Sequence, residues 1–112
     1  MIQIYDKKGF ELLLEVPASS LRGADLAGAR LAEANLVQMD LTDADLSGAD
    51  LTGADLRLAC LRGAKLCGAV LRLADLSGAD LTDADFSGAD LTGAKGLEDT
   101  PPIANFIPLK PV

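Results

Sequence analysis

Apolar residues recur at every fifth position of the chain over Leu21–Leu91. Each of these fifteen positions is leucine except Phe86, and a second series at the same spacing, Ala24–Ala94, is alanine except at Met39. A step of five residues advances about 140° around an α-helix, so the leucines would scatter over all sides of a helix. On a straight strand they would alternate between opposite faces. The register therefore excludes an amphipathic helix and a flat strand.

A coiled chain satisfies the pattern. If the chain runs extended for about three residues, an alanine and the leucine two residues later point to the same side. A corner after each leucine then returns the next such pair to the same interior. A fixed repeat of this kind indicates stacked units that bury a continuous core only together. The sequence therefore predicts an all-β solenoid wound around its own leucines.

The repeat also has a characteristic polar composition, seen in the segments GADLS, GADLT, DADLS and SGADL. These segments resemble the repeats of the pentapeptide-repeat family, whose consensus is A-(D/N)-L-x-x, and the resemblance covers residues 19–95. It implies a right-handed quadrilateral β-helix with four pentapeptides per coil, which gives about four coils for this chain. Residues twenty apart would then stack at the strand spacing of about 4.8 Å.

The flanks of the repeat predict caps at both ends of one domain, which spans residues 1–112. Residues 1–18 hold two apolar runs around a turn signal, which predicts an N-terminal hairpin cap. Apolar and other residues alternate in its second run. This alternation predicts one apolar face, formed by Phe10, Leu12, Leu14 and Val16, that covers the first coil. Residues 96–112 contain four prolines and several apolar residues, which favours an irregular C-terminal cap or tail, with a dimerisation segment as the alternative. We expect a monomer, or a dimer formed through a terminal cap.

Composition favours a cytoplasmic protein. The chain carries a net charge of −7, which disfavours direct binding to nucleic acid. No stretch approaches the run of about 20 apolar residues that a membrane span requires, and the first residues lack the basic and then apolar pattern of a signal peptide. We therefore expect no contact with a membrane.

The sequence offers little catalytic chemistry. Because it contains no histidine, Ser-His and Cys-His nucleophiles are impossible. Two cysteines, Cys60 and Cys67, are too few for a zinc site without histidine, and we expect both to be free thiols. The many aspartates project from a convex rod, so we interpret them as solvated side chains bonded to nearby backbone rather than as catalytic acids. We expect no enzyme activity, no metal and no cofactor.

The stretch between Leu56 and Ala74 departs from the rest of the repeat. It contains no Asp or Glu, while it holds four basic residues and outward apolar residues. One interpretation is structural: Lys65 would lie between Asp45 and Asp85 and form ion pairs across coils. The other is functional, because exposed apolar side chains beside arginine are typical of partner-binding surfaces. The candidate surface consists of Arg57, Leu58, Arg62, Val70, Arg72 and Leu73.

Two functions follow from these observations. The first is a non-catalytic scaffold or protein-interaction module whose partner is a protein. The second comes from the resemblance, because some pentapeptide-repeat proteins protect against quinolones by imitating DNA to a type II topoisomerase such as gyrase. Lines of negative charge favour this alternative. The basic stretch, the short rod and a tail without a helical dimerisation pattern count against it.

Overall fold

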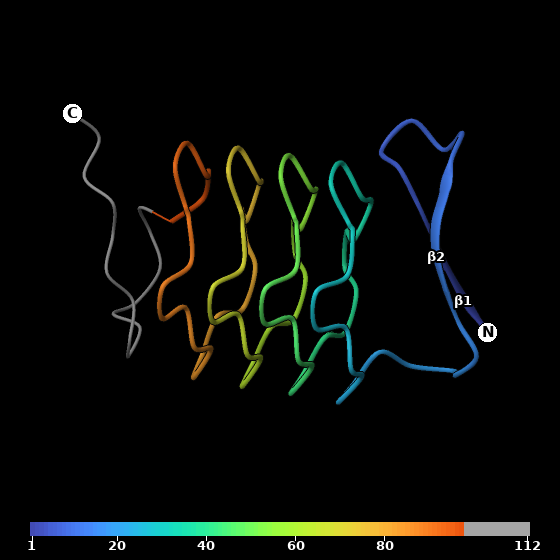
Figure 1. Cartoon of the computed structure of the whole chain (residues 1–112), viewed down its shortest axis with the longest axis horizontal. Helices are drawn as coiled ribbons and strands as arrows, with labels where there is room; N and C mark the ends of the chain where they lie inside the picture. Colours follow the sequence, from blue (N-terminus) through green and yellow to red (C-terminus); the bar gives the residue numbers. More distant parts are fainter. Residues whose placement is uncertain (98–112) are drawn as a thin grey trace.

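The computed structural model describes residues 1–97. The chain begins with two strands, β1 (Ile2–Tyr5) and β2 (Leu12–Val16), which pair as an antiparallel hairpin. The chain then winds into a row of similar coils stacked side by side, with the hairpin at the N-terminal end of the row (Figure 1). Residues 1–97 contain no helix, hence none with the length and apolar character that crossing a membrane requires. Most of the expected C-terminal cap lies outside the described residues.

Parallel β-bridges join residues twenty positions apart, so each coil takes four pentapeptides. The repeated contact is seen at Asp45, whose N–H donates to the Ala24 carbonyl at 2.9 Å and whose carbonyl accepts from the Leu26 N–H at 2.8 Å. The bridges form four ladders along the stack, each called after its first residue: Asp25-Asp45-Lys65-Asp85, Arg30-Asp50-Val70-Asp90, Asn35-Asp55-Asp75-Lys95 and Asp40-Cys60-Asp80. The predicted all-β solenoid is confirmed.

A tight turn forms every corner of the coil. In the first, the Ala24 N–H donates to the Leu21 carbonyl at 3.1 Å, and Gly23 between them has a φ of 66°. A positive φ at the third residue of such a turn favours glycine, which has no Cβ atom to clash with the backbone. The same corner position is left-handed in every repeat, although six repeats place another residue there: Glu33, Gln38, Asp43, Leu58, Leu73 and Asp83.

The leucine register fills the interior of the stack. The leucines at every fifth position over Leu31–Leu76 are fully buried, and Phe86 is 2% exposed in the same register. Each buried leucine contributes on the order of 1.5–3 kcal/mol. The alanine series also faces inward, and Met39, its exception, is half-buried against the core. The prediction from the five-residue spacing therefore holds for the whole core.

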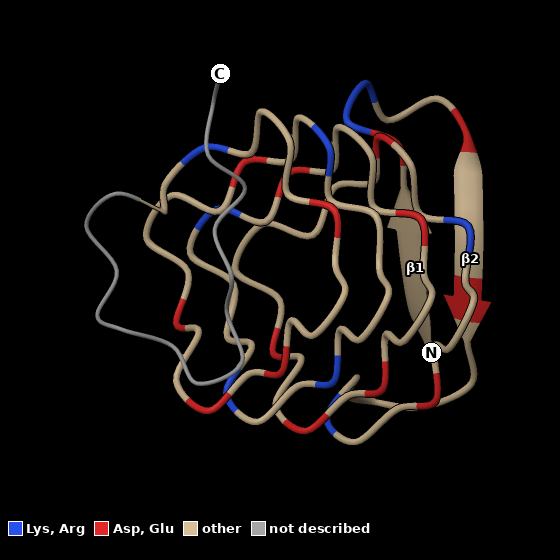
Figure 2. Cartoon of the chain, turned by 60° about the vertical axis from the view of Figure 1, so that its left-hand side comes forward, with Lys and Arg blue, Asp and Glu red and all other residues tan. Residues whose placement is uncertain are grey.

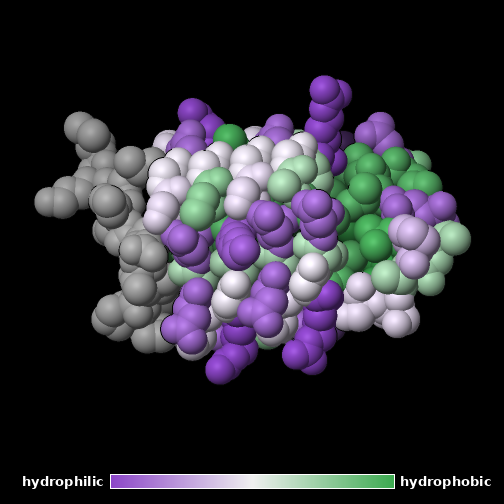
Figure 3. Space-filling view, turned by 60° about the horizontal axis from the view of Figure 1, so that its bottom comes forward, coloured by the Kyte–Doolittle hydropathy of each residue, from purple (hydrophilic) through white to green (hydrophobic). Residues whose placement is uncertain are grey.

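The apolar face predicted for the hairpin is partly wrong. Leu14 and Val16 pack against the core as expected, but Phe10 is 85% exposed, Leu12 is also exposed, and Leu13 packs inward. The cause is an irregularity in the pairing, since Ile4 lies opposite Leu14 whereas Tyr5 lies opposite Leu12. One extra residue in β2 shifts the alternation of its side chains to the other face. Figure 3 shows hydrophobic residues gathered at this hairpin end.

Candidate partner-binding surface

The aspartates of the ladders are held by their own repeats. In the Asp50 repeat, the carboxylate Oδ1 accepts a hydrogen bond from the Thr52 hydroxyl at 2.6 Å and another from the Thr52 N–H at 3.0 Å. These bonds lower the pKa of the Asp50 carboxyl, the hydroxyl contributing most. The same pair of bonds and the same direction of pKa shift recur at Asp40, Asp75, Asp80, Asp85 and Asp90. The interpretation of these residues as local structural elements is confirmed.

Ion pairs across coils exist, but they follow a different spacing from the expected one. Arg62 Nη1 lies 3.2 Å from Asp80 Oδ2, and Arg72 Nη1 lies 3.4 Å from Asp90 Oδ2. Both join residues eighteen apart, because a long side chain two residues after the ladder position reaches the ladder aspartate of the next coil. Lys65 does lie between two aspartates in its ladder, yet it takes part in none of the ion pairs formed within residues 1–97.

The basic residues of the candidate surface are therefore already neutralised. Arg57 forms two hydrogen bonds with the Asp55 carboxylate, from Nε at 2.8 Å and from Nη2 at 2.7 Å. This contact holds the pKa of Asp55 below its ordinary value. Figure 2 shows acidic and basic segments interleaved along the coils. The stretch that looks purely basic in the sequence has no uncompensated line of positive charge.

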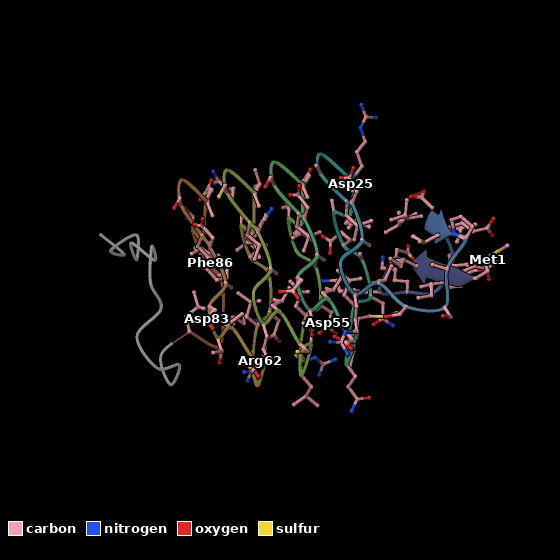
Figure 4. All side chains as sticks on the ribbon, turned by 90° about the horizontal axis from the view of Figure 1, so that it is seen from below. Met1, Asp25, Asp55, Arg62, Asp83 and Phe86 are labelled. Atoms are coloured by element: carbon pink, nitrogen blue, oxygen red, sulfur yellow. The ribbon has the colours of Figure 1, made fainter. Side chains whose placement is uncertain are left out.

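The six candidate residues do not form one flat patch. Val70 belongs to the Arg30 ladder and Arg72 follows it on the same side, whereas Arg62 follows Cys60 of the Asp40 ladder. These two ladders occupy opposite sides of a four-sided coil. The labelled Arg62 projects from the stack on a different side from Asp25 (Figure 4). Arg62 is thus separated from Val70 and Arg72.

Leu58 and Leu73 are brought to the same side. They occupy the two corners that bound the side of the Asn35 ladder, with Leu73 before it and Leu58 after it. Leu58 is 58% exposed and Leu73 is 66% exposed, and both residues have a φ of 62°. We call this side, with Leu58, Leu73, Asp55, Arg57 and Asp75, the leucine-flanked surface. Of the three candidate arginines, only Arg57 belongs to this surface.

The sequence analysis did not predict the left-handed backbone of the two leucines, although the five-residue repeat marks both positions as corners. From Gly23 onward, every fifth residue is the corner residue, and nine of the fifteen are glycine. A branched apolar residue in a left-handed conformation costs about 1–2 kcal/mol, and leucine gains nothing there from burial in the core. Leu58 and Leu73 are the apolar exceptions to a corner series that is otherwise glycine, acidic or amide.

Catalytic and metal chemistry find no support in the described part of the chain. Within residues 1–97, no group of three or more Cys, Asp or Glu side chains is placed to hold a metal ion. Both cysteines are free thiols, as expected. A hydrogen bond with Asp85 raises the pKa of the Cys67 thiol, which disfavours the reactive thiolate.

Comparison with known proteins shows where this arrangement recurs. The sequence profile of the pentapeptide repeats matches residues 19–57 and 59–95, with eight copies, and the single residue between the two segments is Leu58. No curated protein sequence gives a significant match.

Three solved structures are similar to the chain. A pentapeptide repeat protein from the thylakoid lumen of Arabidopsis thaliana is 33% identical over 73% of this chain and 57% of its own, with a TM-score of 0.50. A pentapeptide repeat protein from Nostoc PCC 7120 is 40% identical over 74% of this chain and 77% of its own, with a TM-score of 0.38. QnrB1, a plasmid-mediated fluoroquinolone resistance protein, is 22% identical over 66% of this chain and 44% of its own, with a TM-score of 0.44. The chain thus spans little more than half of the Arabidopsis protein.

Proposed function

We propose that this chain, which belongs to the pentapeptide-repeat family, is a rigid, non-catalytic interaction module that binds a protein partner through the leucine-flanked surface. The proposal rests on one observation: two leucines at left-handed corners are each more than half exposed. Glycine would relieve the backbone at both corners, and aspartate occupies the equivalent corners at Asp43 and Asp83. Neither backbone conformation nor core packing therefore calls for leucine, whereas burial against a partner does.

The chemistry of the surface supports a protein partner. Exposed apolar side chains next to hydrogen-bonded charges are characteristic of protein interfaces, in which apolar anchors are surrounded by polar groups. The Arg57–Asp55 pair is fixed by two short bonds, so it can present a defined polar edge without first losing side-chain freedom. A rigid stack adds to this, because few of its groups must be ordered on binding.

Other features of the proposal concern the whole protein. We include in it a right-handed, quadrilateral stack of about four coils, partly covered by the hairpin at its N-terminal end. We also include a cytoplasmic location, with a monomer or a dimer formed through a terminal cap. The free thiols support a reducing compartment, and contacts between the hairpin and the first coil support the N-terminal cap.

The proposal is tested by affinity purification with the double variant Leu58→Asp, Leu73→Asp as bait. Aspartate is tolerated at left-handed corners, so the variant should fold while its surface becomes charged. The matched control is Gln38→Asp, which adds a charge in the corner column of Leu58, one coil earlier. We expect a partner that is retained by the wild type and by the control but lost by the double variant. Equal retention by all three proteins would remove this surface from consideration.

A DNA-mimicking inhibitor of gyrase is the second candidate. The lowered pKa values of the ladder aspartates favour it, because these side chains stay charged in the native protein. Against it, no ladder holds more than two successive aspartates, since Lys65, Val70 and Cys60 interrupt three of them. DNA presents an unbroken line of phosphates instead. A gyrase supercoiling assay decides the matter, and we expect no inhibition and no relief of quinolone poisoning at large molar excess.

A further inference from the structure

The hairpin closes only part of the N-terminal rim of the coil stack. Its backbone hydrogen bonds to the first coil lie on the Asn35 side, where the Lys7 N–H donates to the Glu33 carbonyl and the Asn35 N–H donates to the Tyr5 carbonyl, both at 2.8 Å. Ala34 beneath these contacts is fully buried. Ala24 and Ala29, which face inward on the two preceding sides of the same coil, remain half-exposed. The backbone edge of the rim is therefore uncovered along the Asp25 and Arg30 sides, although Leu26 and Leu31 on these sides are buried.

This open rim is an unpaired strand edge. In the following coil, Asp45 pairs its N–H with Ala24 and its carbonyl with Leu26. Asp25 occupies the equivalent position in the first coil, where no coil precedes it. Among the described residues, neither the N–H nor the carbonyl of Asp25 finds a hydrogen-bond partner. An unpaired edge of this kind is a template for a strand from another chain.

A groove runs beside this edge and leaves room for such a strand. It has a volume of about 400 Å³ and lies between the end of β2 and the first coil. Leu14, Val16 and Leu26 supply its apolar lining, and the acidic residues Glu15 and Asp25 also line it. Arg22 also lines the groove, but Asp40 lies 3.7 Å from its Nε and partly neutralises it. The groove thus combines apolar contacts, two free backbone groups and an acidic border.

We propose that this groove binds an extended segment of a partner protein, with a small, a basic and an apolar residue in succession, as a parallel strand against Asp25. The pattern follows from the ladder geometry. A residue stacked on Asp25 points outward, so a basic side chain there lies next to the carboxylate, as Lys65 lies next to Asp45 in the same ladder. The residues before and after it stack on Ala24 and Leu26 and point inward, on the side where Leu14 lines the groove. The net charge of −7 favours the approach of a basic segment.

The test uses a short peptide and the full chain. An acetylated, amidated hexapeptide with the sequence Gly-Ala-Lys-Leu-Ser-Gly is titrated into the ¹⁵N-labelled protein, and backbone amide shifts are followed by NMR. We expect saturable shifts centred on Asp25 and Leu26, together with slower hydrogen exchange at the Asp25 N–H. A matched peptide with Glu in place of Lys should bind about two- to five-fold more weakly, as expected for an exposed ion pair.

Charge reversal gives the control for the predicted register. Asp25→Lys should invert the preference between the two peptides, whereas Asp85→Lys, in the same ladder at the far end of the stack, should leave it unchanged. The Leu58→Asp, Leu73→Asp variant should bind both peptides like the wild type, which separates this site from the leucine-flanked surface.

Three results would overturn the proposal. The first is a lack of saturable shifts at Asp25 and Leu26. The second is an Asp25→Lys protein that keeps the wild-type preference. The third is a concentration-dependent shift of the same amides without any peptide, because it would identify the occupant as a second copy of this chain.

Discussion

Leu58 lies over Gly78, the corner residue of the next coil, so closely that a Cβ atom at position 78 would stand 2.6 Å from Leu58 Cδ2. Leu73 lies over Gly93 in the same way, with a separation of 2.8 Å. Each exposed leucine thus leans along the stack into space that only a glycine leaves open. This contact fixes the direction of both side chains on the leucine-flanked surface.

The contact predicts different costs for two otherwise similar substitutions. Gly48→Ala should destabilise the protein by about 1–2 kcal/mol, because φ is 69° and nothing lies within 4 Å of the added methyl group. Gly78→Ala should cost more, because it adds the displacement of Leu58 to the same backbone term. Urea denaturation of both variants, repeated in a Leu58→Ala background, measures the difference. Equal costs in the wild-type background would contradict the contact.

Leu73 is predicted to be dispensable for stability. Asparagine adopts the left-handed conformation more readily than leucine, so Leu73→Asn relieves strain while it loses the contact with Gly93. We expect a free energy of unfolding between the wild-type value and about 1 kcal/mol above it. Leu71→Asn, two residues earlier and fully buried, should cost several kcal/mol. A comparable loss in both variants would show that Leu73 belongs to the core.

The aspartate ladders predict a dependence of stability on pH. The Thr52 hydroxyl lowers the pKa of Asp50 below its ordinary value of 3.8. A carboxyl whose pKa is lowered in the folded state stabilises the protein above the pKa of the unfolded chain, and this contribution is lost as the pH falls through the folded value. The free energy of unfolding should therefore decrease below about pH 4.

The variant Thr52→Val tests the cause of that shift. It removes the hydroxyl donor and leaves the backbone donor, so the pKa of Asp50 should rise toward its ordinary value. An NMR titration of the Asp50 carboxyl carbon measures this directly. Thr82→Val should raise the pKa of Asp80 and leave Asp50 unaffected. An unchanged Asp50 in the Thr52→Val protein would refute the hydroxyl as the main cause.

Much of the fold could be predicted because the leucine register is a property of the backbone. The buried series follows from the five-residue spacing alone, and the ladder neighbours follow once the family resemblance supplies four pentapeptides per coil. The local bonds of the aspartates were also accessible, because donor and acceptor are two residues apart. Neither conclusion depends on how a long side chain turns.

The ion pairs and the apolar face of the hairpin could not be predicted from the sequence. They depend on the direction of long side chains and on one irregularity in the strand pairing. Arg62 reaches Asp80 rather than a neighbour in its own coil, which only the path of its long side chain decides. The shift between Ile4 and Tyr5 exchanged the roles of Leu12 and Leu13 in the hairpin. The open rim at Asp25 arises because the hairpin bonds to one side of the first coil, and no spacing in the sequence specifies that side.

The central claim is that the five-residue register separates leucines that build the core from leucines that are free to bind. It is tested most directly by the free energies of unfolding of Leu51→Asp and Leu58→Asp, measured by urea denaturation. Leu51 is fully buried, so its variant places an unpaired charge in the core and should not fold. Leu58 is exposed at a corner that accepts aspartate, so its variant should stay within about 0.5 kcal/mol of the wild type. Equal destabilisation of the two variants would contradict the account.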